Sequence, residues 1–248
     1  MDTYNQYGTF ETQIKLLDTM KSIHDLCVEK CIKYSLCGGS LLGAVREKGF
    51  IPWDDDMDIV MDRENYKKFI ECFATQSQLE IVEDIWVPRV VKKDDSSSRK
   101  AFVDIFIFDN VPENRIVSGM KVFCVKIIQG MLKNDADYSK YSTFEKVLVF
   151  GTSILGKLFT LRLKKRLYSW VSQWANDEKT SCINAYNDLY KLLGLRYPAE
   201  IIKGYHLVEF EDAKFFIMDG FDTYLTMQYG DYMTPPSIEE RCPRHMTN

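Results

Sequence analysis

The feature of this sequence that most limits its fold is an acidic cluster that runs directly into a strand-like apolar pattern. Asp54–Asp58 places four carboxylates in five positions, and every second residue from Met57 to Met61 is apolar, which is the period of a β-strand. On such a strand Asp56 and Asp58 face the same side, roughly 7 Å apart. The segment is therefore either a solvated acidic turn or a site whose oxygen ligands hold one or two hard cations. Mg²⁺ is the expected cofactor, with Mn²⁺ as the alternative.

A calcium-binding loop does not fit the same segment. Counted from Asp54, the sixth position is Ile59 rather than glycine, and the twelfth is Asn65 rather than glutamate. An EF-hand loop needs glycine for its sharp turn and a bidentate glutamate at those positions.

A glycine pair precedes the acidic cluster. Gly38, Gly39 and Ser40 follow a short expected strand, 35–37, and lead into an expected helix, 40–48. Glycine lets the backbone approach a ligand, and the N-terminus of a helix offers amide donors to phosphate. Glycine turn, helix and strand with paired aspartates is the order of nucleotidyltransferase-like sites, although the glycines alone would also suit an ordinary turn.

A further carboxylate lies inside an apolar run. Asp104 is the polar residue in Phe102–Phe106, and burying an isolated carboxylate is costly. Asp104 is therefore expected to bind the metal, to act as general base on an acceptor hydroxyl, or to pair with a nearby cation such as Arg89.

Bulk properties exclude several classes of protein. The chain has 248 residues, 46% hydrophobic, a net charge of −4 and a pI near 5.5, so it can bury a sizeable core but lacks the basic footprint of a sequence-independent nucleic-acid binder. Its seven cysteines are scattered without a C-x-x-C pair, which favours a reducing compartment. With neither a secretory signal nor a membrane-spanning run, the expected location is cytoplasmic.

The order of elements predicts a mixed α/β (α+β) fold. Residues 1–114 are expected to form the catalytic core and 115–200 a helical subdomain, and 201–248 a hairpin, helix and tail that complete the core. The expected helices are 11–34, with Ile14, Leu17 and Ile23 facing inward, 40–48, 63–73 and 221–229. The expected strands are 35–37, 57–61, 80–83, 87–93, 101–108, 208–210 and 214–218.

The middle of the chain is basic. Residues 115–175 contain 11 Lys or Arg and 3 Asp or Glu, so their net charge is +8. Since the net charge of the whole chain is −4, the other residues carry −12. Within it Leu163, Leu167 and Trp170 recur at helical spacing beside Arg162 and Arg166. Such a helix could pack on the core and expose its charges to water. Alternatively, it could bind peripherally to the inner face of an anionic membrane.

Several motifs together resemble the LicD family, which includes bacterial phosphocholine transferases and is related to the fukutin-type ribitol-phosphate transferases. The resemblance covers most of the chain except the basic middle. Its motifs are Gly39–Arg46, Gly49–Ile59, Val103–Phe106, Phe210-Glu211, Tyr224-Leu225, Tyr229–Met233 and Pro235-Pro236. Two departures are Ser40, where the family often has threonine, and Met218, near which it often has proline.

The resemblance implies a nucleotidyltransferase-like fold and transfer of an alcohol phosphate, most simply phosphocholine from CDP-choline, to a sugar hydroxyl. The acceptor would be a glycan or lipid-linked glycan of lipopolysaccharide, teichoic acid or capsular polysaccharide. Asp56 and Asp58 would hold the metal on the donor pyrophosphate, and Asp104 would complete the site or activate the acceptor. Gly38, Gly39 and Ser40 would contact phosphate, Arg46 would offset its charge, and Trp53 would pack the strand entrance, stack on cytosine or cage choline.

Alternatives remain for the donor and for the class of protein. CDP-glycerol or CDP-ribitol would serve the same mechanism, and a nucleoside triphosphate would make the protein a conventional nucleotidyltransferase. A non-catalytic scaffold whose acidic loop only binds metal is the alternative from another class, but the cost of keeping Asp54, Asp55, Asp56, Asp58 and Asp104 together would then be unexplained.

Overall fold

The structure is a computed structural model that describes residues 7–73, 78–82, 86–93, 101–133, 143–176 and 180–243. The chain divides into two compact units: unit 1 is Met1–Glu83, Pro88–Ile107 and Glu200–Asn248, and unit 2 is Asp84–Val87 and Phe108–Ala199. The predicted mixed α/β fold is confirmed, whereas the boundaries predicted for separate domains stay a prediction. Within the described ranges, no helix combines the length and the apolar character needed to cross a bilayer.

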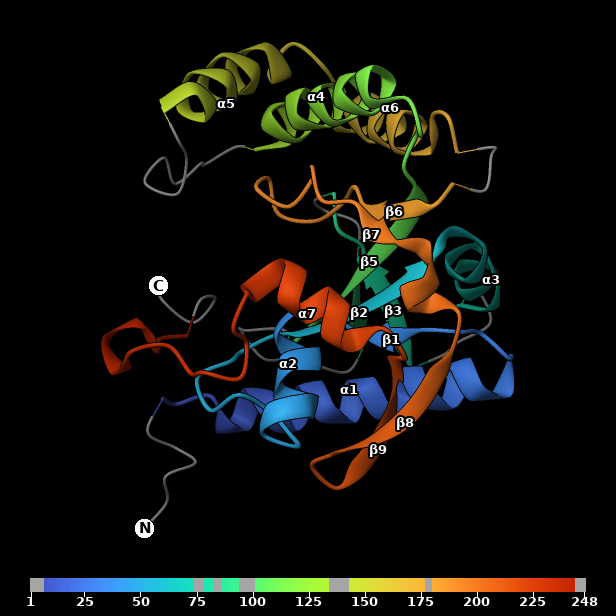
Figure 1. The fold of residues 1–248 in the computed structure, drawn as a ribbon, viewed down its shortest axis with the longest axis vertical. Helices are drawn as coiled ribbons and strands as arrows, with labels where there is room; N and C mark the ends of the chain where they lie inside the picture. The colour runs from blue at the N-terminus through green and yellow to red at the C-terminus, as the bar shows by residue number, and fades with distance from the viewer. Residues whose placement is uncertain are drawn as a thin grey trace. The chain divides into compact units, whose positions relative to one another are not determined.

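Unit 1 combines a sheet, a hairpin and helices (Figure 1). Its sheet has the strand order β1-β2-β5-β4-β3, and β8 and β9 form a separate antiparallel hairpin. Its elements are α1 (Phe10–Glu29), β1 (Ser35–Leu36), α2 (Gly38–Arg46), β2 (Met57–Asp62), α3 (Arg63–Phe73), β3 (Leu79–Val82), β4 (Arg89–Lys92), most of β5 (Val103–Asn110), the 3₁₀ helix η3 (Ala199–Ile202), β8 (Tyr205–Phe210), β9 (Ala213–Met218), α7 (Phe221–Tyr229) and the 3₁₀ helix η4 (Ile238–Glu240).

Helix α1 begins near its predicted start but ends at Glu29 rather than at residue 34. Its buried face includes Leu16, Met20 and Ile23, whereas Ile14, which was expected to face inward, is exposed. The spacing of the buried residues is that of one helical stripe. Ile14 lies off that stripe, so the prediction for it was wrong.

The segment that carries the glycines and aspartates is close to the predicted one, with two differences. Helix α2 starts at Gly38, so the glycines form its first turn and do not precede it. Strand β2 starts at Met57, so Asp56 lies just before the strand. The strand is confirmed, but the alternation holds only in part: Met57, Ile59 and Met61 are buried and Asp58 is partly exposed, whereas Val60, expected on the face of Asp58, is buried as well.

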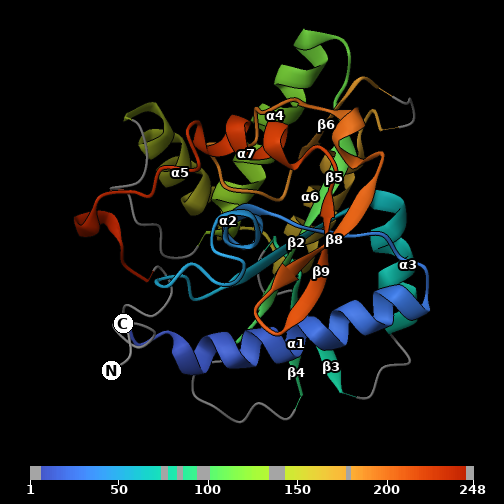
Figure 2. The same cartoon turned by 60° about the horizontal axis from the view of Figure 1, so that its bottom comes forward.

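Helices α2 and α7 lie side by side in both ribbon views (Figures 1 and 2).

Tyr34 ties three elements of unit 1 together. Its hydroxyl lies 2.7 Å from Nδ1 of His24 in α1 and accepts a hydrogen bond from the amide of Phe216 in β9. Next to it, Ser35 Oγ in β1 accepts from the amide of Met218 at 2.8 Å. The hairpin is thereby attached to β1, the strand that leads into the glycine pair.

Unit 2 contains the helices expected in the basic middle region and two strands that were not predicted. They are α4 (Arg115–Leu132), α5 (Thr143–Gly156), α6 (Leu161–Gln173), β6 (Cys182–Ala185) and β7 (Tyr197–Pro198). The end of β5 pairs antiparallel with β6, with Phe108 opposite Ala185. Strands this short leave little periodic signal in a sequence, which is why they were missed.

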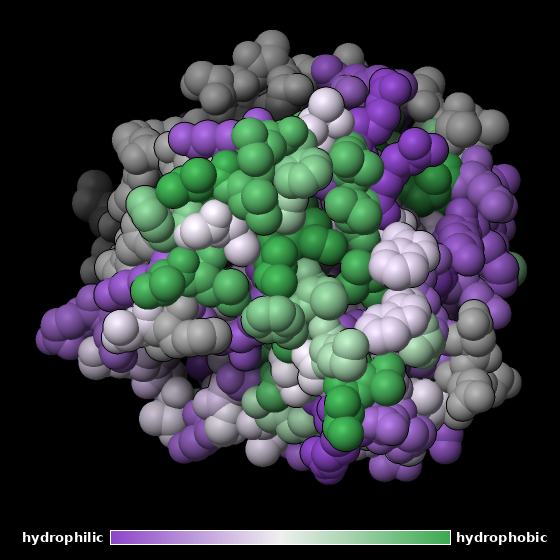
Figure 3. Space-filling model, turned by 90° about the horizontal axis from the view of Figure 1, so that it is seen from above, coloured by the Kyte–Doolittle hydropathy of each residue, from purple (hydrophilic) through white to green (hydrophobic). Residues whose placement is uncertain are grey.

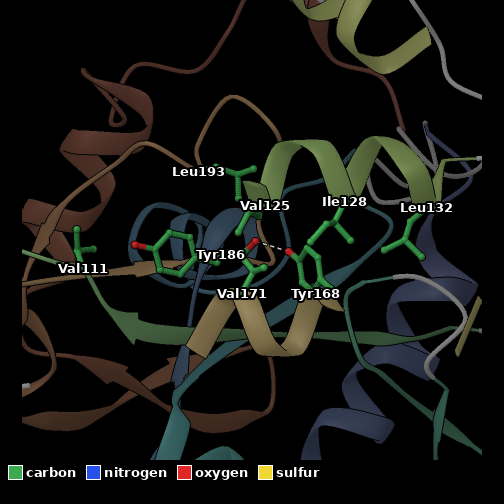
Figure 4. Packing of buried hydrophobic residues seen from close by; sticks show 8 residues of the cluster. All are labelled: Val111, Val125, Ile128, Leu132, Tyr168, Val171, Tyr186 and Leu193. Atoms are coloured by element: carbon green, nitrogen blue, oxygen red, sulfur yellow. Dashed lines mark hydrogen bonds between the residues drawn. The ribbon is translucent and has the colours of Figure 1, made fainter. Parts of the chain in front are cut away.

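The core of unit 2 is formed by α4, α6 and the segment around β6 (Figure 4). Val125 and Ile128 of α4 pack with Val171 of α6. The Tyr168 hydroxyl donates a hydrogen bond to the carbonyl of Tyr186, so a polar group inside this apolar cluster has its partner. The helices therefore have a core of their own.

Candidate active site

Two carboxylates of the acidic segment lie against the two glycines that open α2. A Cβ built on Gly38 would be 2.6 Å from Asp58 Oδ2, and one built on Gly39 would be 2.5 Å from Asp54 Oδ2. Neither position can hold a side chain unless a carboxylate moves. The structure thus brings the glycine pair and the acidic cluster together at a helix N-terminus, where the first backbone N–H groups have no intrahelical partner.

Ser40 joins α2 to β2. Its hydroxyl accepts a hydrogen bond from the amide of Asp58 at 2.9 Å, and the amide of Cys37 donates to the carbonyl of Asp58 at 3.1 Å. Ser40 is buried. Its observed role is to hold Asp58 at the start of the helix, and its contact with phosphate stays a prediction.

The loop that carries the aspartates is held by residues from distant parts of unit 1. Gln13 Nε2 donates to the carbonyl of Asp54 at 2.9 Å, and Thr9 Oγ1 donates to the carbonyl of Pro52 at 2.8 Å. On the other side of the loop, the amide of Phe50 donates to Glu211 Oε1 at 2.9 Å.

Sequence reasoning missed these three supporting side chains. A signal existed for Thr9 and Gln13, because they continue the buried stripe of α1 as polar residues, and buried polar groups need partners. Glu211 belonged to a motif of the family resemblance but had no assigned role.

Tyr224 of α7 is a further residue of the site to which the sequence assigned no role. Its hydroxyl accepts hydrogen bonds from the amide of Gly38 at 3.3 Å and from Gln228 Nε2 at 3.0 Å. The ring is buried. Tyr224 therefore fixes the first residue of α2 from the opposite end of the chain.

Asp104 pairs with Arg89, the cation that the sequence suggested as one of its alternatives. The two residues are opposite each other on β4 and β5, and Arg89 Nε lies 3.1 Å from Asp104 Oδ1. Their side chains are only 21% and 12% exposed. The guanidinium also lies 4.1 Å from the ring centre of Phe102. A metal-binding or general-base role for Asp104 stays a prediction beside this ion pair.

Of the three predicted metal ligands, Asp58 is the one that the structure places beside the glycine pair. Among the described residues, no three His, Cys, Asp or Glu side chains form a group that could hold a metal ion, so the set of Asp56, Asp58 and Asp104 stays a prediction. Two carboxylates, those of Asp54 and Asp58, nevertheless lie beside the glycine pair, and carboxylate oxygen is the ligand type that a hard cation prefers. Mg²⁺ in phosphate-transferring sites commonly takes one or two carboxylates and completes its shell with substrate phosphates and water.

Arg46 and Trp53 have neighbours that the sequence did not indicate. Arg46 lies in the last turn of α2, at the other end of the helix from the glycines; it donates to Glu47 Oε1 at 2.7 Å and to the carbonyl of Tyr232 at 3.1 Å. Trp53 makes an edge contact with Tyr7, and Arg241 lies 5.1 Å from the centre of its ring. Phosphate contact by Arg46 and ligand contact by Trp53 stay predictions.

Comparison with known proteins decides the family. The chain is 30% identical over 255 residues to the lipopolysaccharide cholinephosphotransferase LicD of Haemophilus influenzae, and the match covers 95% of each protein. The chain belongs to the LicD family. Residues 31–123 also match the family model described as LicD/FKTN/FKRP, nucleotidyltransferase domain. The expectation of an enzyme of this family is thereby confirmed.

Two shorter matches fall on parts of this LicD-family chain. An uncharacterized protein of Rickettsia typhi is 41% identical over 66 residues, which is 27% of this chain and 21% of that protein. An uncharacterized protein of Rickettsia prowazekii is 50% identical over 46 residues, which is 18% of this chain and 17% of that protein. These local matches show similarity without adding a function.

Proposed function

We propose that this enzyme transfers phosphocholine from CDP-choline to a sugar hydroxyl of a lipopolysaccharide-type glycan. The observation that carries the proposal is the 30% identity over 95% of both chains to a lipopolysaccharide cholinephosphotransferase. The site supports it, because the glycines, the carboxylates of Asp54 and Asp58 and the N-terminus of α2 adjoin one another. Teichoic acid and capsular polysaccharide are the alternative acceptors.

The proposed reaction breaks the pyrophosphate bond of the donor. The acceptor oxygen attacks the phosphorus that carries choline, the bond from that phosphorus to the oxygen of cytidine monophosphate breaks, and cytidine monophosphate leaves with the electron pair. The acceptor proton passes to a base, the role proposed here for Asp104. Arg89 limits how that carboxylate can turn, since it holds Oδ1.

The residues around α2 have two proposed tasks in this reaction. The N-terminus of α2 offers backbone amides to the donor phosphates, and the lack of a Cβ at Gly38 and Gly39 leaves room for the carboxylates of Asp58 and Asp54 beside it. Asp56 and Asp58 would hold Mg²⁺ or Mn²⁺. When bound, the cation would neutralise negative charge on the pyrophosphate. Ser40 and Tyr224 keep this geometry through their contacts with Asp58 and Gly38.

The choice of choline rests on the relative, and Trp53 is the residue of this chain that could favour it. The guanidinium of Arg241 lies 5.1 Å from the centre of its ring, and a quaternary ammonium group that bound to this face would take the place of that cation. CDP-glycerol and CDP-ribitol would need hydrogen-bonding partners in its place.

A donor panel tests the proposed function. The purified chain is incubated with Mg²⁺ and CDP-choline, CDP-glycerol, CDP-ribitol or each nucleoside triphosphate, and slow hydrolysis without acceptor is followed by ³¹P NMR. We expect CDP-choline to be used best, with release of cytidine monophosphate. Preference for another CDP-alcohol would change the substrate and keep the mechanism. Preference for a triphosphate, with release of pyrophosphate, would overturn the proposal.

A further inference from the structure

Each of the three helices of unit 2 exposes a stripe of large apolar side chains. On α4 the stripe contains Ile116, Met120 and Phe123, spaced by four and three residues, and Ile116 is 75% exposed. These positions lie on one face of a helix. Other residues of α4, including Val125 and Ile128, pack in the core, so the exposed stripe is a second apolar face.

Helices α5 and α6 repeat the pattern. On α5 the exposed residues are Val147, Phe150 and Ile154, and on α6 they are Leu163, Leu167 and Trp170, of which Trp170 is 65% exposed. Helix α6 uses Tyr168 and Val171 for the core. The residues that the sequence offered for core packing, Leu163, Leu167 and Trp170, are therefore exposed, and a different side of the helix packs inward.

Apolar side chains gather on the face that α4, α5 and α6 form (Figure 3). The space-filling view shows a broad hydrophobic area with hydrophilic residues along much of its border. We call the nine residues of the three stripes the apolar face. Contiguous apolar surface of this kind marks an interaction site more often than chance exposure does.

The charged residues described in the segment that carries the apolar face are almost all positive. The described residues of 115–176 include ten Lys or Arg and one acidic residue, Glu145. Glu145 pairs with Lys126 at 3.1 Å, and Lys121 and Lys164 are buried against backbone carbonyls. The cations at the surface are Arg115, Lys146, Lys157, Arg162, Lys165 and Arg166.

We propose that the apolar face docks on the surface of a bilayer that contains anionic phospholipid. Helices that lie in the plane of a membrane bury an apolar side and place Lys and Arg against lipid phosphates, and tryptophan favours that interface. A second copy of the chain is a poorer occupant, because a two-fold dimer would set the same cations against one another. This proposal does not rest on the donor or the acceptor of the reaction.

Vesicle binding tests the proposal on the full chain. Vesicles of phosphatidylcholine with about one-third phosphatidylglycerol, and vesicles of phosphatidylcholine alone, are sedimented with the protein at low and high salt. We expect binding to the anionic vesicles that weakens with salt, and a blue shift of tryptophan emission. Absence of binding to anionic vesicles at low salt would overturn the proposal, as would a dimer in solution that is lost with Trp170→Ser.

Matched variants separate docking from folding. Leu163→Ser with Trp170→Ser removes apolar contact, and Arg162→Glu with Arg166→Glu reverses two charges; each pair is expected to weaken binding by at least about tenfold. The controls are Leu207→Ser on β8 and Lys67→Glu with Lys68→Glu on α3, which also lie at the surface. Equal losses in the controls would overturn the proposal. Hydrolysis of donor without acceptor is expected to stay unchanged in all four proteins.

Discussion

Asp58 Oδ2 occupies the space that a side chain at Gly38 would need, since a Cβ there would lie 2.6 Å away. Gly38 also has a φ of +54°, in the left-handed region. Strand β2 and helix α2 therefore meet at a point where only glycine fits without displacement of a carboxylate. This contact makes position 38 a sensitive test of the site.

Gly38→Ala is expected to lower turnover by at least about tenfold and stability by about 1–2 kcal/mol, because alanine is strained at this φ and pushes Asp58 aside. Activity and urea unfolding are measured together. Gly119→Ala is the matched control: apart from the adjoining residues and backbone of its own helix, nothing lies within 4 Å of the added Cβ, and alanine is a better helix former by about 1 kcal/mol. Full activity of Gly38→Ala would contradict the assignment of this contact to the site.

Asp56→Asn and Asp58→Asn are each expected to reduce turnover by at least about 100-fold while the fold stays intact or becomes slightly more stable. Each change removes one negative charge from a crowded acidic segment, so repulsion falls. Turnover is measured across a Mg²⁺ titration, and unfolding by denaturant. Near-normal activity at saturating Mg²⁺ in either variant would show that the metal assignment is wrong.

Glu211→Ala is expected to lower turnover several-fold and stability by about 1 kcal/mol, because the amide of Phe50 loses its acceptor. Glu211→Gln keeps an acceptor oxygen and should recover most of the loss. Asp212→Ala is the neighbouring control, since Asp212 pairs with Lys21 at the surface. If Glu211→Gln were as impaired as Glu211→Ala, the charge of Glu211 and not its hydrogen bond would matter.

Asp104 and Arg89 allow a structural role to be separated from a chemical one. Arg89→Met is expected to lower stability by about 1–3 kcal/mol, because the largely buried carboxylate of Asp104 loses the hydrogen bond from this cation. Asp104→Asn combined with Arg89→Met should recover stability but stay at least about 100-fold slower in turnover. Recovery of both stability and turnover in the double variant would show that Asp104 has a structural role, through its ion pair with Arg89, and no chemical one.

Asp188 predicts a pH dependence of stability in unit 2. Burial raises the pKa of Asp188 from 3.8 to about 7. Between these values the folded state keeps a proton that the unfolded state has lost, so stability falls as pH rises through this interval. Asp188→Asn stays neutral and should flatten the profile. Urea unfolding at about pH 5 and about pH 8 measures the difference; identical pH profiles for the two proteins would refute the prediction.

Local patterns were sufficient for the elements that pack in simple ways. Helices α3 and α7 have their predicted bounds, and β2 buries the apolar residues Met57, Ile59 and Met61 as predicted. Apolar periodicity reports which face of a segment is buried, and it needs no knowledge of distant residues. It failed at Ile14, where tertiary packing buried a different face of the helix, and in β6 and β7, which are too short to show a period.

The sequence by itself determined the acidic cluster, the glycine pair before it, the mixed α/β class and, through its motifs, the family. Only the tertiary structure decided that Asp54 and Asp58 face the two glycines, that Tyr224 holds Gly38, and that Arg89 pairs with Asp104. The reason is physical. Residue types and local periods follow from neighbours along the chain, whereas hydrogen bonds and ion pairs between distant residues depend on how strands and helices pack.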